Sequence, residues 1–128
     1  MNTAAVLAAL TGALEAQGLV VLVDQPRAPL PSVEILPPGF DQFHEMNESW
    51  DDVRRSLWLL RLYSEPTFPA AVDLVDTTLG ALRADVTLGG VVAYVLPARV
   101  DAPRKDSTDT NNQTRYIREM VLAIEHNP

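Results

Sequence analysis

The densest group of metal-ligating side chains lies in the stretch "HEMNESWDD", where His44, Glu45 and Glu48 are followed by Asp51 and Asp52. Two histidines one helical turn apart, with a glutamate between them, bind zinc and activate water in the pattern H-E-x-x-H. Here Glu48 stands where the second histidine is needed, and the flanking residues have the composition of a loop. A solvated acidic loop is therefore the favoured interpretation, and a small acidic enzyme with a metal site in this loop is an alternative.

Other combinations of reactive residues give weaker patterns. None of the serines lies in the G-x-S-x-G turn that exposes a nucleophile, and His126 stands close to the end of the sequence, a poor place to fix a general base. Asp73 and Asp76 share one helical face, but charged residues on such a face usually serve solubility. We therefore expect no catalytic residues, no cofactor and no metal, and predict that the protein is not an enzyme.

The composition narrows the class of protein further. The 128 residues carry 17 acidic and 10 basic side chains, a formal net charge of −7, which opposes tight binding to nucleic acid phosphates. It does not oppose a surface past which DNA merely slides. The absence of cysteine excludes disulfides and fits a cytosolic or virion protein. The apolar first residues lack the basic start of a signal peptide, and no apolar run has the length of a membrane span.

Periodicity predicts the elements that must position any site. In residues 3–17 and 70–84, apolar side chains recur every three or four positions, as in helices with one buried face. The polar segment 101–114 is expected to be a mobile loop because it has too little apolar surface to order itself. Runs rich in β-branched, leucine and aromatic residues predict strands at 19–24, 32–36, 54–64 and 114–126. Residues 86–100 are expected to form a strand or a bent hairpin arm, in which Gly89 and Gly90 indicate a bulge or a turn.

These elements predict one α+β domain over residues 1–128, with an antiparallel or mixed sheet of about four to five strands and two helices packed on one face. Several strands are apolar on both sides at their centres. Either the segment 39–53 or a neighbouring subunit must cover the face opposite the helices, and the subunit is the simpler cover. Trp50 would be a lid on the sheet or an interface anchor. The residues predicted to form a subunit interface are Trp50, Leu57, Leu59, Arg61, Arg104, Lys105, Arg115, Val121 and Ala123.

This order of elements resembles the tail terminator proteins, also called minor tail or tail completion proteins, of long-tailed bacteriophages. The resemblance consists of a first helix, the strand "RRSLWLLRLYS", the helix "AAVDLVDTTLGALRAD", a further strand, a polar loop and the final strand "TRYIREMVLAIE". It covers most of the chain in order and length. The segment 37–53 has no counterpart in the pattern.

The resemblance implies a structural virion protein at the head-proximal end of the tail, assembled in the host cytoplasm. Its copies would form a ring, commonly a hexamer, that caps the tail tube, ends its polymerisation and presents a surface to the head connector. The implied partners are other copies of the chain, the tail tube protein and the head connector or stopper protein, with DNA passing through a negatively charged channel and no membrane involved. A different head-to-tail connector component, such as a stopper or adaptor, is the alternative.

Overall fold

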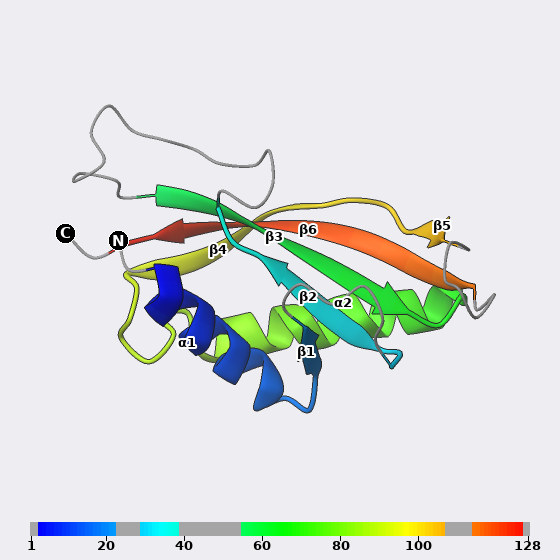
Figure 1. Cartoon of the computed structure of the whole chain (residues 1–128), viewed down its shortest axis with the longest axis horizontal. Helices are drawn as coiled ribbons and strands as arrows, with labels where there is room; N and C mark the ends of the chain where they lie inside the picture. Colours follow the sequence, from blue (N-terminus) through cyan, green and yellow to red (C-terminus); the bar gives the residue numbers. More distant parts are fainter. Residues whose placement is uncertain (1–2, 23–28, 39–54, 107–113, 127–128) are drawn as a thin grey trace.

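The computed structural model describes residues 3–22, 29–38, 55–106 and 114–126 (Figure 1). Two helices and six strands follow one another along these segments. No helix among the described residues has the length and apolar character needed to cross a membrane. In chain order the elements are α1 (Thr3–Glu15), β1 (Val20–Leu22), β2 (Ser32–Leu36), β3 (Arg55–Ser64), α2 (Phe68–Ala84), β4 (Tyr94–Val100), β5 (Arg104–Asp106) and β6 (Arg115–Glu125).

The strands form one mixed sheet in the order β1-β2-β3-β6-β4, with β5 also paired to β6. Only the β1–β2 pair is parallel; β2–β3, β3–β6, β4–β6 and β5–β6 are antiparallel. The predicted α+β class with a mixed sheet is confirmed. The sheet has six strands, one more than the upper end of the predicted range.

The central pair of the sheet is β3 with β6. Ten residues of each strand pair without a break, from Arg55 opposite Glu125 to Ser64 opposite Tyr116. Because side chains alternate between the two faces of a strand, this register places all even-numbered residues of both strands on one face. That face carries Trp58, Leu60, Leu62, Met120, Leu122 and Ile124, all of them fully buried.

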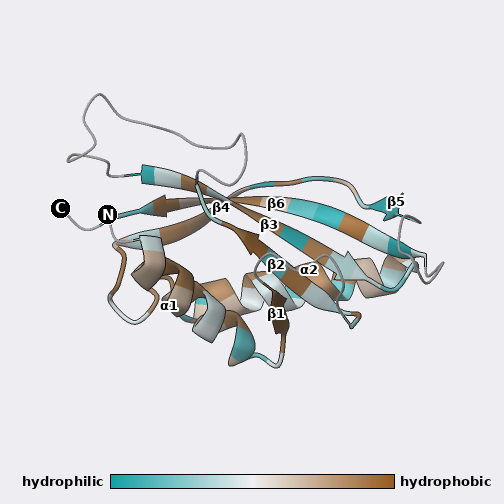
Figure 2. Cartoon of the chain, viewed as in Figure 1, coloured by the Kyte–Doolittle hydropathy of each residue, from teal (hydrophilic) through white to brown (hydrophobic). Residues whose placement is uncertain are grey.

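Both helices pack on this even-numbered face of the β3–β6 pair (Figure 1). From α1, the residues Val6, Leu10 and Leu14 enter the core at a spacing of four, so one stripe of the helix is buried. The helix α2 contributes a second stripe that includes Leu74 and Leu82. In Figure 2 the ribbons of β3 and β6 carry both hydrophobic and hydrophilic stretches, and α1 and α2 lie on the same side of the sheet. The helices therefore cover one face of the sheet only.

The start of α2 differs slightly from the prediction. The helix begins at Phe68, two residues before the predicted start, because Thr67 serves as its N-cap and its side-chain oxygen accepts a hydrogen bond from the backbone N–H of Ala70 at 3.3 Å. Pro69 fits the first turn, where its missing N–H costs nothing. The residues "TFP", 67–69, therefore carry the sequence pattern of a helix start.

Within 86–100, the turn indicated by Gly89 and Gly90 is confirmed, whereas a strand that begins at residue 86 is wrong. Residues 85–93 form turns, and β4 begins only at Tyr94. Three consecutive residues have positive φ, namely Leu88 at 48°, Gly89 at 69° and Gly90 at 90°. Glycine adopts this region without strain, whereas Leu88 is held there with its side chain buried in the core. The buried Leu88 side chain thus holds this turn against the core.

The prediction that 101–114 is an unordered loop is wrong for its first residues, and 107–113 lie outside the described residues. Arg104–Asp106 form β5, and the N–H of Asp101 donates to the carbonyl of Glu119 at 2.8 Å. The prediction considered only apolar burial. This segment is held instead by backbone pairing with β6 and by ion pairs from Arg104 and Asp106.

The face of the sheet opposite the helices, here called the second face, is already covered at its centre. Leu59, Val121 and Ala123 lie on it and do not belong to the cluster under the helices, yet the single chain leaves Val121 only 5% exposed and the other two 1%. The chain's own atoms therefore bury these three side chains. A neighbouring subunit is not required to cover them.

A charge on either face of β6 should consequently unfold the single chain. We expect both Val121→Asp and Leu122→Asp to lower the free energy of unfolding by about 3–5 kcal/mol, because each buries an unpaired carboxylate. The matched control is Val91→Asp, at a position 40% exposed, which should stay within about 0.5 kcal/mol of wild type. Urea unfolding followed by circular dichroism measures all three. A stable Val121→Asp monomer would show that the second face opens readily.

Candidate functional site

A row of alternating charges crosses the second face from strand to strand. Glu34 of β2 pairs with Arg61 of β3 at 3.7 Å, and Arg61 donates through Nε to Oε2 of Glu119 on β6 at 3.3 Å. Glu119 also accepts from Arg104 of β5 at 2.9 Å. The strand register causes this order, since Arg61 lies directly opposite both Glu34 and Glu119. The row links four strands through side chains.

A second group stands beside this row. The hydroxyl of Tyr63 donates to Oε1 of Glu34 at 2.8 Å, and the guanidinium of Arg115 lies over the Tyr63 ring, 4.4 Å from its centre. Arg115 donates in turn to Asp106 of β5 at 3.0 Å, with both side chains largely buried. The contact with the Tyr63 ring and the ion pair with Asp106 together hold the Arg115 side chain in one place.

The charges in this row shift one another's proton affinity. Burial and the hydrogen bond to Glu34 raise the pKa of Tyr63 to about 12. Burial alone would raise the pKa of Glu119, but the hydrogen bonds from Arg104 and Arg61 outweigh it and lower that pKa. Burial would likewise lower the pKa of Arg61, yet its bond to Glu119 leads to a net increase. At neutral pH Arg61 and Glu119 are therefore charged and Tyr63 is neutral, so the ion pair between β3 and β6 persists.

The predicted interface residues are divided by the structure into three groups. Leu59, Arg115, Val121 and Ala123 are buried in the single chain, whereas Leu57 and Arg61 are half-buried. Arg104 and Lys105 on β5 are exposed. Trp50 lies outside the described residues. Of the described residues in this set, only Arg104 and Lys105 are exposed to a partner without rearrangement, so the interface remains a prediction.

One pair of potentially reactive residues was missed at the sequence level. The hydroxyl of Ser56 and Nε2 of His126 lie 2.7 Å apart, and the indole N–H of Trp58 donates to the same hydroxyl at 2.9 Å. The expectation that His126 is poorly held is therefore wrong. The alternation of side chains along β3 could have indicated that Ser56 is buried, because it puts Ser56 on the same face as Trp58.

A nucleophile and base at this distance have the spacing of a catalytic pair. However, Ser56 is only 1% exposed and its oxygen already accepts from Trp58, so a substrate carbonyl has no open approach to it. Burial lowers the pKa of His126, which keeps its imidazole neutral at pH 7. The pair fastens the end of β6 to the start of β3.

The described residues also contain no group of three or more His, Cys, Asp or Glu side chains placed to hold a metal ion. The cluster of His44, Glu45, Glu48, Asp51 and Asp52 lies outside the described residues.

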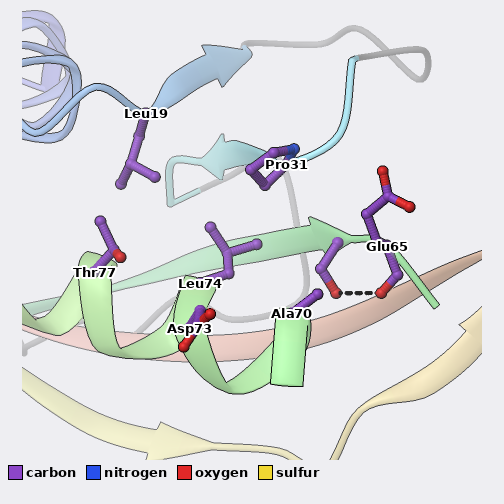
Figure 3. Close-up of a pocket in the computed structure, with 8 residues that line it drawn as sticks. Leu19, Pro31, Glu65, Ala70, Asp73, Leu74 and Thr77 are labelled. Carbon is purple, nitrogen blue, oxygen red and sulfur yellow. Dashed lines mark hydrogen bonds between the residues drawn. The ribbon is translucent and has the colours of Figure 1, made fainter. Parts of the chain in front are cut away.

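Two hollows lie on opposite flanks of α2. The first, here called the β1-side hollow, measures about 220 Å³ and is bounded by the residues preceding β1 and β2, the end of β3 and the first half of α2 (Figure 3). In Figure 3, Leu19 points toward Leu74 and Thr77 of α2, with Pro31 and Glu65 at the far side. Its lining is Leu19, Pro31, Ser64, Glu65, Ala70, Asp73, Leu74 and Thr77.

The second, here called the β4-side groove, measures about 310 Å³ and lies between the second half of α2 and β4. It is mainly apolar and has one basic residue, Arg83. Of the residues that line it, Tyr94 and Leu96 are large, apolar and exposed, at 45% and 48%, and their pairing with Glu125 and Ala123 puts their side chains on the second face. Its lining is Leu79, Leu82, Arg83, Val86, Tyr94, Val95, Leu96, Pro97 and Val100.

Comparison with solved structures finds this fold in a bacteriophage protein, described as "Structure of bacteriophage SPP1 gp17 protein". The two share 17% sequence identity with a TM-score of 0.53, over 98% of this chain and 91% of gp17. At this identity the likeness establishes a common fold. No protein-family model matches the sequence, and no curated protein matches it.

The charge row predicts that Tyr63 matters for stability through its hydroxyl. Tyr63→Phe removes a hydrogen bond to the buried Glu34 and should lower the free energy of unfolding by about 1–2 kcal/mol. Tyr94→Phe removes the same group from an exposed ring and should change it by less than about 0.5 kcal/mol. Urea unfolding of both variants provides the comparison. Equal effects would mean that the Tyr63–Glu34 bond adds nothing.

The buried histidine predicts a pH dependence. Because the pKa of His126 is lowered in the folded state, the unfolded chain takes up a proton first as the pH falls below about 6.5. Stability is therefore complete above that pH and decreases as the pH falls toward the folded-state pKa. We expect His126→Gln to flatten this part of the profile of melting temperature against pH, and His44→Gln, the other histidine, to leave it in place. An unchanged slope in His126→Gln would contradict this assignment.

Proposed function

We propose that this chain is a structural protein of a bacteriophage tail whose copies form a ring, with six as the expected number. The ring caps the tail tube, ends its polymerisation and offers a surface to the head connector. The observation that carries the proposal is the fold shared with bacteriophage SPP1 gp17 over nearly the whole of both chains. The resemblance to tail terminator proteins, seen in the order of strands and helices, supports the same role.

The charge of the chain supports this role. A formal charge of −7 per copy would give a ring a strongly negative surface. DNA that passes through its opening would be repelled by the wall and would not adhere to it. DNA is thus a passing cargo in this proposal and not a bound ligand.

The buried reactive residues support a structural role over a catalytic one. Ser56 and His126 are buried and hydrogen-bonded to each other. The acidic and basic side chains of the charge row on the second face form ion pairs between strands. We propose that the protein is not an enzyme and acts through its surfaces, with itself, the tail tube protein and the head connector as partners.

Tail tubes incubated with the purified protein provide the test. We expect negative-stain microscopy to show a ring at one end of each tube, and further addition of tube protein to stop at that end. Mass measurement of the released caps should give about six times the 14.0 kDa of one chain. Tubes without the protein are the control and should continue to lengthen.

Tubes that lengthen equally with and without the protein would contradict the capping role. Caps with a different mass would retain the role and change the number of copies. A tightly retained metal, found by elemental analysis of the purified protein, would instead favour the enzyme alternative based on residues 44–52.

A further inference from the structure

The β1-side hollow and the β4-side groove lie at opposite ends of the strand order, β1-β2-β3-β6-β4. They also use opposite flanks of α2. Ala70, Asp73 and Thr77, spaced by three and four, share one flank, whereas Leu79 and Arg83 share the other. A single copy therefore presents the two surfaces on different sides.

The two surfaces carry opposite charge. Glu65 and Asp73 on the β1-side hollow are exposed, and neither has an ion pair within the described part of the chain. Arg83 on the β4-side groove is likewise exposed and forms no ion pair with a described residue. Because these carboxylates and this guanidinium lie on opposite sides of one copy, they complement each other between two copies.

Both edges of the sheet also carry exposed apolar groups next to these surfaces. Val20 on β1 is 43% exposed, a value close to those of Tyr94 and Leu96 on β4, and the strand register puts all three side chains on the second face. Large apolar side chains gathered at both edges of one sheet suit burial in an interface.

The backbone of β4 is protected against simple addition of another strand. The outward N–H of Val95 already donates to the carbonyl of Val86 at 2.9 Å. Pro97, two residues further and therefore on the same edge, has no N–H, and the pairing is irregular between Pro97 and Arg99. A partner on this edge must bind through side chains in the groove.

We propose that neighbouring copies pack with the β4-side groove of one against the β1-side hollow of the next, so that Arg83 of the first faces Glu65 and Asp73 of the second. The contact joins two different surfaces, and such contacts generate closed rings when the rotation between copies permits it. This inference rests on the proposed function, since it assumes that the copies assemble.

The second copy is the occupant that these surfaces favour. An acidic hollow and a basic groove on the same chain complement each other, and neither needs a foreign partner to explain its charge. The tail tube protein is the competing occupant.

Charge exchange tests the contact. Arg83→Glu and Asp73→Arg each replace an attraction by a repulsion and should weaken assembly of caps by about tenfold. The variant with both changes should recover most of the loss, because the pair is restored in reversed order. Both positions are exposed, so circular dichroism and melting temperature of all three variants should match wild type.

The matched control combines Arg83→Glu with Asp76→Arg. Asp76 is an exposed acid on the same helix but lines neither hollow, so this variant has the same net charge as the exchanged pair and should not recover assembly. The readouts are the mass of caps and the fraction of capped tubes, each against protein concentration.

The outcomes separate this contact from the proposed function. Wild-type caps together with single variants that assemble normally would overturn the contact while retaining the ring. Single variants that fail and are not rescued by exchange would also overturn it, and would assign these surfaces to the tail tube protein. A wild-type protein that never caps a tube would instead contradict the proposed function.

Discussion

The register between β3 and β6 is the constraint on which the rest of the structure depends. Ten uninterrupted pairs fix which side chains of both strands lie under the helices and which lie on the second face. A slip of one residue would turn over one of the two strands, which would send Trp58 of β3 or Leu122 of β6 away from the core and bring Arg61 or Glu119 into it. The burial of large side chains on one face and the ion pairs on the other thus support the same alignment.

The charge row on the second face makes that alignment more specific. Arg61 lies between Glu34 and Glu119, so one guanidinium joins three adjacent strands. An ion pair of this kind adds little stability compared with apolar packing, but it strongly disfavours arrangements in which one partner is left alone. We infer that the main effect of the row is to disfavour sheets in which the strands pair in a wrong register. It also explains why a polar segment such as β5 can be ordered without apolar burial.

Much of the fold could be predicted from periodicity, because helices and long strands leave a clear apolar pattern. The strand Ser32–Leu36 was predicted with its exact bounds, and both helices were found within two residues at each end. The turn before β4 was indicated by Gly89 and Gly90, but its length was not, because a buried leucine at positive φ has no pattern that distinguishes it from a strand residue. β5 was missed because its order comes from partners distant in sequence.

The candidate site was harder to predict than the fold. Two-sided apolar strands were recognised, but whether the chain itself covers Val121 depends on packing that no local pattern records. The contact between Ser56 and His126 joins residues 70 positions apart, and only the register of β6 brings them together. The two hollows beside α2 had no sequence signal at all, since they arise from the separation of elements.

The order of strands in the sheet also has a consequence for how the chain acquires its fold. β6 comes after all the other described strands in the chain, yet it lies between β3 and β4 and pairs with β5 as well. During synthesis on the ribosome, β3 must therefore wait with one edge unpaired and its large apolar side chains only partly covered. Such long-range pairing slows folding, and a nascent chain in this condition is exposed to aggregation. Chaperones would therefore bind the unpaired edge of β3 before any assembly partner does.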